Sequence, residues 1–496
     1  MCERSEMAAR STGRNLRAGH KWQLQLLAVA FAGLSGFGFG CSSKSNSPIG
    51  GGETINTGGA TSASGGNGGL ASVGGAAVGG SAASGGAKDG GTNLGTDGGN
   101  MQSRLTAISE RLTKLADSTI NFWLTHGPDG TNGFFATLAQ RGNLISPTDK
   151  GLIQESRNLW AMTTWYELRG HSDVARMAAD NLYNFIVAHY IDSADGEFFY
   201  KVSADGSAVV DKKKQFYSEG FAIFALSNYG RVFGNSTAIA YALACFRSID
   251  ARGHDPVYGG YDETNDAGWV TDGAKKDMNA HIHLMEAFAS LYQASGDDLA
   301  KTRLNEFIDL VATKLLQPGG YQQLEFNLDW TPFGTPTVSY GHDLETSWLM
   351  LDSARIAGRD SDATIRAASL AMGTNSSSYG FDSTHGGYYS EGKPTGAVTV
   401  KDKIWWVQFE ALSGLWWMYQ LSGNTVHLDR MEATVTWLEM ANDATYGEWY
   451  WTTNDDGTPG SHGTNKGEEW KAAYHVMRSL MFNVDWLSNA LRTGGG

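Results

Sequence analysis

The chain has 496 residues, a net charge of −14 at pH 7, and an aromatic content of 11%. An acidic chain of this kind does not favour a nucleic acid or an anionic membrane surface as a partner. Of its three cysteines, Cys2, Cys41 and Cys245, only the last lies outside the N-terminal segment. We therefore expect no internal disulfide, a stability that comes from a large core, and a Cys245 that is buried as a small hydrophobe.

Residues 1–41 have the three parts of a secretory signal peptide. Basic side chains, among them Arg10, Arg14, Arg17 and Lys21, precede the apolar run LQLLAVAFAGL, which is too short for a membrane span, and small residues follow it. The run GFGFGC resembles the lipobox of bacterial lipoproteins, although Gly38 stands where that box usually has leucine. We expect Cys41 to be lipidated, with plain cleavage nearby as the alternative. The protein would then be exported and anchored to a bacterial membrane, in the periplasm or at the cell surface.

Residues 42–101 form a low-complexity segment in which glycine and other small residues dominate. Such a segment cannot bury enough apolar surface to offset the entropy lost on ordering. We predict a flexible linker here, and one folded catalytic domain over residues 102–496.

Within that domain, a turn of small residues followed by an aromatic residue recurs six times, at a step of about 63 residues. The stretches between the turns place apolar residues at i, i+3, i+4 and i+7 and end in glycine, which is typical of amphipathic helices. Six helix pairs that repeat once around predict an all-α (α/α)6 barrel, with an open solenoid as the alternative. The first aromatic residues of the turns are Phe134, Phe198, Tyr261, Tyr321, Tyr388 and Trp449.

Three histidines, His283, His342 and His475, fall near the starts of predicted helices in different repeats. In a closed barrel these positions converge on one central pit, whereas a single histidine at such a place is usually a capping or core residue. His281 lies two residues from His283, on another side of the helix, so the two do not form the i, i+4 pair of a helical zinc site. We predict no metal.

Several stretches, taken together and in order, resemble the N-acylglucosamine 2-epimerase superfamily, and most closely its cellobiose 2-epimerases. The likeness covers nearly all of residues 104–485. It implies an (α/α)6 barrel that epimerises C2 of the reducing-end aldose of a disaccharide such as cellobiose or mannobiose, without a cofactor. The stretches are SRNLW, KKQFYSEGFAIFALS, MNAHIHLMEAF, SYGHDLETSW, WWVQFEAL, GEWYW and WKAAYH.

The resemblance also assigns the chemistry of the site. His342 and His475 would be the acid/base pair that moves protons through an enediol or enediolate, supported by His283. Arg157 would stabilise the oxygen that becomes negative, because its guanidinium is always charged. The alternative for Arg157 is a structural ion pair with Glu155 or Asp149.

Substrate binding would come from a second set of residues. Glu345, three residues after His342, is expected to orient its imidazole or to bind a sugar hydroxyl. Trp405 is expected in the core, because two adjacent tryptophans on a helix point about 100° apart. The sequence departs from the family after the last histidine, where Val476 replaces a small or amide residue, and this puts the substrate preference in doubt. The binding residues would be Asn279, Tyr217, Glu345, Trp406 and Trp470.

Three other functions remain open at this point. An aldose–ketose isomerase of the mannose isomerase type would share the barrel and the enediol. A glycoside hydrolase would use a pair of carboxylates on the same barrel. A tethered glycan-binding lipoprotein would bind sugar without turnover. The expected partner in each case is a small sugar or glycan, and the oligomeric state is open.

Overall fold

The structure is a computed structural model, in which the predicted signal segment, Cys41 and most of the predicted linker lie outside the described residues. None of the helices in the described part is long and apolar enough to cross a membrane. The described residues are 94–145, 148–263, 266, 268–269 and 275–493.

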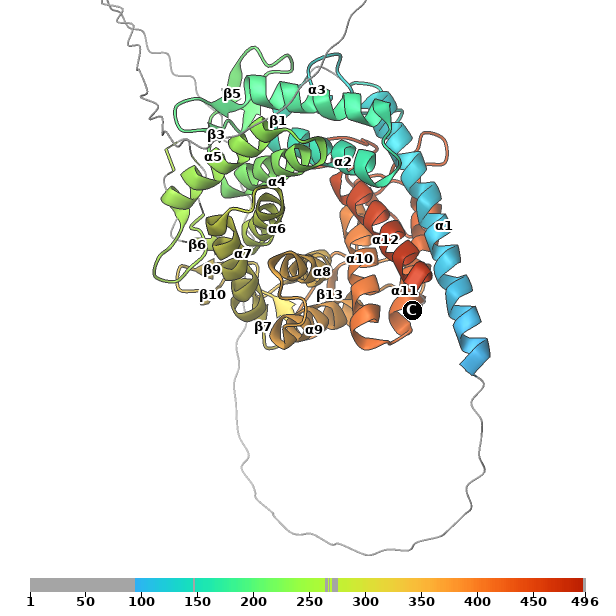
Figure 1. The fold of residues 1–496 in the computed structure, drawn as a ribbon. Helices are drawn as coiled ribbons and strands as arrows, with labels where there is room; N and C mark the ends of the chain where they lie inside the picture. The colour runs from blue at the N-terminus through green and yellow to red at the C-terminus, as the bar shows by residue number, and fades with distance from the viewer. Residues whose placement is uncertain (1–93, 146–147, 264–265, 267, 270–274, 494–496) are drawn as a thin grey trace, which may run out of the picture. The chain divides into compact units, whose positions relative to one another are not determined.

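Twelve α-helices of the described chain alternate between an inner and an outer ring (Figure 1). The inner helices are α2 (Leu152–Leu168), α4 (Phe216–Phe233), α6 (Met278–Ser295), α8 (Tyr340–Ala357), α10 (Trp405–Ser422) and α12 (Tyr474–Thr493). The outer helices are α1 (Leu94–His126), α3 (Asp173–His189), α5 (Ser236–Gly253), α7 (Asp298–Leu310), which continues into a π-helical turn (Val311–Leu315), α9 (Ala363–Gly380) and α11 (Val426–Ala441).

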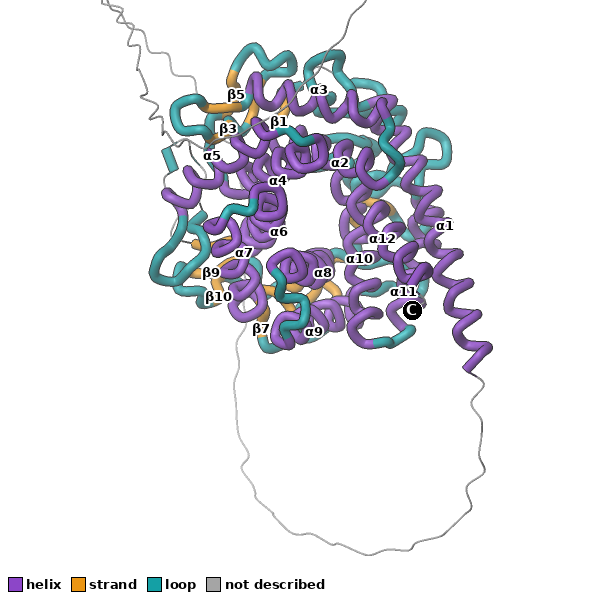
Figure 2. Tube along the Cα trace, in the orientation of Figure 1, coloured by secondary structure: helices purple, strands orange, loops and turns teal. Residues whose placement is uncertain are grey.

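The inner ring is closed. Each inner helix contacts the next, and α12 returns to α2 (Figure 2). Each outer helix packs mainly on one inner helix: α1 on α12, α3 on α2, and so on around the ring. The predicted (α/α)6 barrel is thus confirmed, and an open solenoid is excluded because the first and last inner helices contact each other.

Four of the stretches between the turns that end in glycine form α4, α6, α8 and α10. Each ends at a glycine in the left-handed conformation, with φ of 66°, 67°, 80° and 68°, as their sequences predict. All four are inner helices, and most of their residues are buried because both their neighbours in the ring and an outer helix cover them. At the other end of the domain, α1 begins at Leu94, so residues 94–101 of the predicted linker are helical and continue the hydrogen bonding of α1.

The strands are two or three residues long and lie in the loops. All their pairings are antiparallel, in the orders β1-β4-β5, β10-β9-β6, β11-β12-β13, β14-β15, β2-β3 and β7-β8. Their bounds are β1 (Lys150–Gly151), β2 (Ile191–Asp192), β3 (Glu197–Phe198), β4 (Lys201–Val202), β5 (Val209–Asp211), β6 (Lys275–Asp277), β7 (Leu316–Gln317), β8 (Tyr321–Gln322), β9 (Glu325–Asn327), β10 (Pro332–Phe333), β11 (Val338–Ser339), β12 (Glu391–Gly392), β13 (Val398–Val400), β14 (Lys403–Ile404) and β15 (Thr452–Thr453).

Five of the six repeated turns are tied to the following inner helix by one hydrogen bond. A backbone N–H just after the turn donates to a buried side chain near the start of that helix. This bond gives Asp343 and His281 a structural role at the starts of their helices. The pairs are Phe134 with Glu155 (3.1 Å), Phe198 with Glu219 (3.2 Å), Tyr261 with His281 (3.0 Å), Gln322 with Asp343 (2.9 Å) and Tyr388 with Gln408 (2.7 Å).

The sixth turn makes the tie differently. Glu448 has φ of 62°, at a place where other turns have a left-handed glycine such as Gly133 or Gly387. A Cβ added to those two glycines would lie 2.3 Å and 2.7 Å from the acceptor atoms of Glu155 and Gln408. In the sixth turn the Glu448 side chain takes that space and accepts a hydrogen bond from Lys471 at 2.8 Å. These hydrogen bonds hold the N-terminal ends of the inner helices in place, and the candidate active site lies at those ends.

Cys245 is buried and free on α5, as predicted. Its thiol donates to Glu219 at 3.1 Å.

Candidate active site

The N-terminal ends of the inner helices surround a cavity of about 240 Å³. Trp405 and Trp451 line it together with all nine residues that the sequence proposes for the site. The closed ring therefore brings residues from six repeats to one place, although their roles are not set by position alone. The nine residues are Arg157, Tyr217, Asn279, His283, His342, Glu345, Trp406, Trp470 and His475.

His342 lies in the first turn of α8. Its Nδ1 is hydrogen-bonded to the hydroxyl of Ser339 at 2.7 Å, which leaves Nε2 for a proton transfer. Its ring lies against the indole of Trp406, with 4.7 Å between the ring centroids. Burial lowers the pKa of His342 to about 4, so the imidazole is neutral at pH 7 and able to act as a base.

His475 contacts the same indole from α12. Its ring centroid lies 5.6 Å from that of Trp406. Its Nδ1 is 2.8 Å from a carboxylate oxygen of Glu410. Burial lowers the pKa of His475, and the nearby Glu345 carboxylate opposes that effect. Like His342, this histidine has one nitrogen held by the protein and the other left for the substrate.

Each of the three histidines is followed, three residues later, by a charged residue one turn deeper in the barrel. These are Glu286 after His283, Glu345 after His342, and Arg478 after His475. With Glu410 they form what we call the ion layer: Glu286, Glu345, Glu410 and Arg478. The guanidinium of Arg478 is fully buried and pairs with Glu286 at 2.6 Å, with Glu410 at 2.7 Å, and with Glu345.

The pKa values of two carboxylates in the ion layer shift in opposite directions. For Glu286, burial raises the pKa, but the Arg478 guanidinium outweighs that effect and the pKa falls to about 2. For Glu410, burial outweighs Arg478 and the pKa rises. Three carboxylates face one arginine, so the layer has an excess of negative potential beneath the histidines. That potential stabilises a proton on a nearby imidazole.

Of the two roles expected of Glu345, the orientation of the His342 imidazole is wrong, and the binding of a sugar hydroxyl stays a prediction. The structure places Ser339 at Nδ1 of His342, and Glu345 pairs with Arg478. The nearer imidazole nitrogens are Nδ1 of His475, at 3.8 Å, and Nε2 of His283, at 3.9 Å. The reason is the position of Glu345 on α8. It lies three residues after His342, and therefore one turn deeper in the barrel, beside Arg478 of α12.

The guanidinium of Arg157 binds neutral groups. It donates to the hydroxyl of Tyr217 at 2.6 Å and to the backbone carbonyl of Trp470 at 3.0 Å. Its centre lies 4.3 Å from the ring centroid of Phe221. The alternative ion pair with Glu155 or Asp149 is not formed, because Glu155 ties the first turn instead. Arg157 therefore keeps a full positive charge at the cavity.

Tryptophans line the cavity at different depths. Trp405 is buried against Trp451, with ring centroids 4.5 Å apart, and its neighbour Trp406 contacts both catalytic candidates. Trp405 is buried in the core, as expected, and it also lines the cavity, because α10 starts at this residue. Trp470 is 40% exposed and lies at the mouth. The sequence analysis missed Trp451, although it is the last residue of the motif GEWYW.

Several buried polar atoms of the lining residues have no partner within the protein: Nε of Arg157, Oδ1 of Asn279 and Oε2 of Glu345. Buried polar atoms are normally hydrogen-bonded, so these atoms suit a ligand rich in hydroxyl groups. Val476, the departure from the family pattern, is fully buried and does not line the cavity. The lining itself is therefore unaffected by that substitution.

One group near the cavity has the spacing of a metal site. Ligand atoms of Glu345, Glu410 and His475 lie within 4.8 Å of one another. Arg478 contacts both carboxylates, so the chain itself places a positive charge at that point.

A second such group, Asp382, His385 and Asp455, lies near Lys403. The ammonium of Lys403 is 2.7 Å from Asp382 and 2.9 Å from Asp455. This lysine has the same function there as Arg478 has in the ion layer.

Comparisons with known proteins bear on the same residues. A family model described as N-acylglucosamine 2-epimerase (GlcNAc 2-epimerase) matches residues 133–479. A cellobiose 2-epimerase from Bacteroides fragilis is 29% identical over 384 residues, covering 74% of this chain and 95% of the relative. Another, from Ruminococcus albus, is 30% identical and covers 75% of this chain and 97% of the relative. The solved structure of cellobiose 2-epimerase from Spirochaeta thermophila superposes with a TM-score of 0.71 at 27% identity, over 81% of this chain and 100% of that one.

The barrel, the cavity and these relatives define the chain as a carbohydrate epimerase or isomerase. The family model spans most of the barrel. The chain belongs to the N-acylglucosamine 2-epimerase family.

Proposed function

We propose that this protein is a sugar 2-epimerase that inverts C2 of the reducing-end aldose of a disaccharide similar to cellobiose or mannobiose. The observation that carries the proposal is the pair of imidazoles, His342 and His475, which line one cavity and contact one indole. Inversion requires a proton to leave one face of C2 and another to arrive at the opposite face. Two separate acid/base groups meet that need, whereas one group does not.

The steps follow from the open-chain sugar. A neutral imidazole takes the C2 proton, and the electron pair of the broken C–H bond moves toward the carbonyl to give an enediolate. Arg157 supplies the positive charge that stabilises its oxygen. The other histidine, which takes up a proton from solvent during the reaction, gives that proton to the opposite face of C2, and the first histidine releases its own proton to solvent. Each histidine is the base for one epimer and the acid for the other, and the negative ion layer stabilises the protonated partner.

The depth of the aromatic residues favours a substrate of two rings. Trp406 lies inside against both histidines, where the reacting sugar must be. Trp470 lies at the mouth, where its exposed ring can stack on a second sugar. The unpartnered atoms of Asn279 and Glu345 offer hydrogen bonds to hydroxyl groups of the inner ring.

The test is NMR product analysis in heavy water with cellobiose, mannobiose and mannose. We expect the C2 epimer of a disaccharide with deuterium at C2, and loss of that product in His342→Ala and His475→Ala. A ketose with label at C1 would instead establish an aldose–ketose isomerase. Release of monosaccharides would establish a hydrolase, and binding without any product would establish a glycan-binding protein.

We also propose that the protein is exported and lipidated at Cys41, and acts on oligosaccharide fragments outside the cytoplasm. The basic, apolar and small-residue sequence of residues 1–41 supports this proposal. Membrane fractionation of the wild type against Cys41→Ala tests it. A wild type found in the soluble fraction would remove the lipid anchor.

A further inference from the structure

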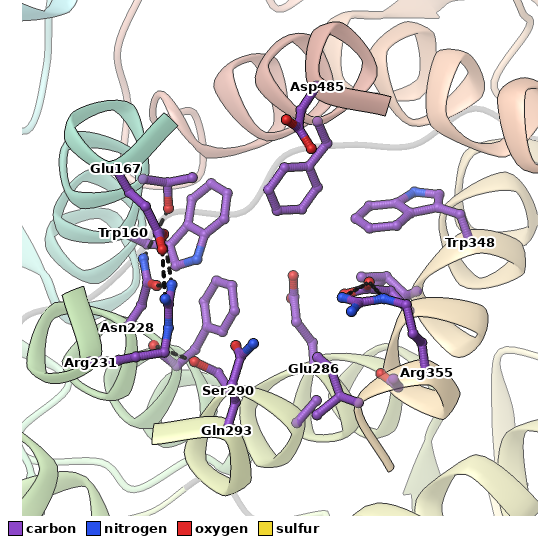
Figure 3. Close-up of a pocket in the computed structure, with 18 of the residues that line it drawn as sticks. Trp160, Glu167, Asn228, Arg231, Glu286, Ser290, Gln293, Trp348, Arg355 and Asp485 are labelled. Atoms are coloured by element: carbon purple, nitrogen blue, oxygen red, sulfur yellow. Dashed lines mark hydrogen bonds and ion pairs between the residues drawn. The ribbon is translucent and has the colours of Figure 1, made fainter. Parts of the chain in front are cut away.

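A second cavity of about 240 Å³ lies at the opposite end of the inner helices (Figure 3). It is surrounded by the C-terminal halves of α2, α4, α6, α8 and α12, whereas the active-site cavity is surrounded by their N-terminal ends. The ion layer lies between the two cavities. Glu286 belongs to this layer, and its carboxylate points into the second cavity in Figure 3.

Aromatic side chains form one wall of this second cavity. Trp160 and Phe224 stack with 5.3 Å between ring centroids and 16° between ring planes. Phe482 meets Trp160 edge-on at 5.8 Å and lies 5.6 Å from Trp486. Trp348 continues the wall at 5.8 Å from Trp486. Such a wall offers flat faces to the CH groups of a ligand.

The charged side chains around this wall are mostly paired with one another. Arg231 binds both carboxylate oxygens of Glu167, at 2.6 Å and 2.7 Å. Arg355 pairs with Asp352 at 2.8 Å. Glu286, as described, pairs with Arg478 of the ion layer.

The remaining carboxylate of the lining, Asp485, accepts a hydrogen bond from Asn489 at 3.0 Å. Both lining arginines are therefore neutralised, which disfavours a phosphate or carboxylate ligand. The carboxylates of Glu167 and Asp352 are neutralised in turn, and that of Glu286 is held by Arg478 within the ion layer, which disfavours a cation. Asn228, Ser290 and Gln293 add uncharged polar groups. A neutral ligand that is rich in hydroxyl groups and has an apolar face fits this combination.

We propose that this cavity is a second, non-catalytic binding site for a neutral saccharide. Every acid/base candidate for C2 chemistry lies on the other side of the ion layer, so a sugar bound here is held and not converted. The site does not depend on the proposed epimerase reaction. Its occupant adds to the sugar bound at the active site and does not compete with it.

The test measures the binding stoichiometry of methyl β-cellobioside, whose blocked reducing end prevents ring opening and turnover. We expect two bound molecules per wild-type chain by isothermal titration, and one in Trp486→Ala or in Gln293→Trp, which fills the cavity from an exposed position. At this site Kd should rise at least about tenfold in either variant. The matched control is Trp417→Ala, because Trp417 packs on Trp486 without lining the cavity. It should keep two sites.

Trp470→Ala should remove the other binding event, at the active-site mouth. Thermal unfolding confirms that each variant is folded, and turnover of cellobiose by Gln293→Trp should remain within about twofold of wild type. A wild type with one site that Trp470→Ala removes would overturn the proposal. So would a lack of any binding, or two sites that both cavity variants retain. None of these results changes whether deuterium appears at C2 in the NMR assay. Failure of the second-site proposal is therefore distinguishable from failure of the epimerase proposal.

Discussion

Glu410 is the residue whose replacement best tests the proposed proton transfer. One of its carboxylate oxygens accepts from Nδ1 of His475 at 2.8 Å and from Arg478 at 2.7 Å. The other accepts from the indole N–H of Trp348 at 3.0 Å. Both oxygens therefore face donors. Glu410→Gln replaces one oxygen with an NH2 group, and either orientation of the amide places a donor against a donor.

The expected loss follows from what the carboxylate does during the reaction. When His475 takes a proton, Glu410 forms a hydrogen bond to an imidazolium, and a hydrogen bond to a charged group is worth about 1.5–3 kcal/mol. Loss of that bond lowers kcat by about 10- to 100-fold. Glu410 does not line the cavity, so KM should change by no more than about twofold.

The assay is the initial rate on cellobiose and mannobiose between about pH 5 and pH 9, with kcat and KM determined separately. Trp348→Phe is the matched control, because it removes the bond to the other oxygen and leaves the His475 contact in place. We expect that control to retain kcat within about threefold. An unchanged kcat in Glu410→Gln, or a loss that appears mainly in KM, would refute the role of Glu410 in holding the imidazolium.

Three further results are expected. Arg157→Lys should lower kcat/KM about 100-fold while the protein stays folded, because an ammonium cannot both bind the hydroxyl of Tyr217 and face the enediolate as the guanidinium does; kinetics and thermal unfolding measure this. Burial lowers the pKa of His281 to about 4, below the value of about 6.5 expected in the unfolded chain, so the wild type loses stability as the pH falls from 6.5 to 4. His281→Gln keeps an acceptor for the N–H of Tyr261, and should lose about 2 kcal/mol less between pH 7 and pH 4.5 in urea unfolding. Burial raises the pKa of Glu155 to about 8, so the sign is reversed: this group costs stability as the pH rises from 4.5 to 8. Glu155→Gln should therefore gain about 3 kcal/mol at pH 8 relative to pH 5. Parallel pH dependences of wild type and variant would contradict either of the last two expectations.

The barrel was predictable from the sequence because the residue patterns that specify it recur at regular intervals. The six aromatic turns mark the repeats, and the helical pattern with terminal glycines marks the inner helices. Closure of the ring then placed the three histidines and the other candidates in one cavity, since equivalent positions of a closed barrel converge. None of this required knowledge of a particular side-chain contact.

The ion layer was harder to predict, because its contacts join helices that are distant in sequence. Glu286, Glu410 and Arg478 stand out as charged residues within the apolar stretches HLMEAF, VQFEAL and HVMRSL, and that signal was available. Which partner each one finds depends on the register of α6, α8, α10 and α12 across the barrel. The sequence therefore paired Glu345 with the histidine on its own helix, and missed the arginine on another.

The ion layer also limits how sugars move. Arg478, Glu345 and Glu410 are fully buried across the middle of the barrel, so in the described part of the chain their side chains separate the two cavities. The substrate and the product of the active site must therefore use the same entrance, beside Trp470. Product must then leave before the next substrate molecule can bind. The rate of product release therefore sets an upper bound on the turnover rate.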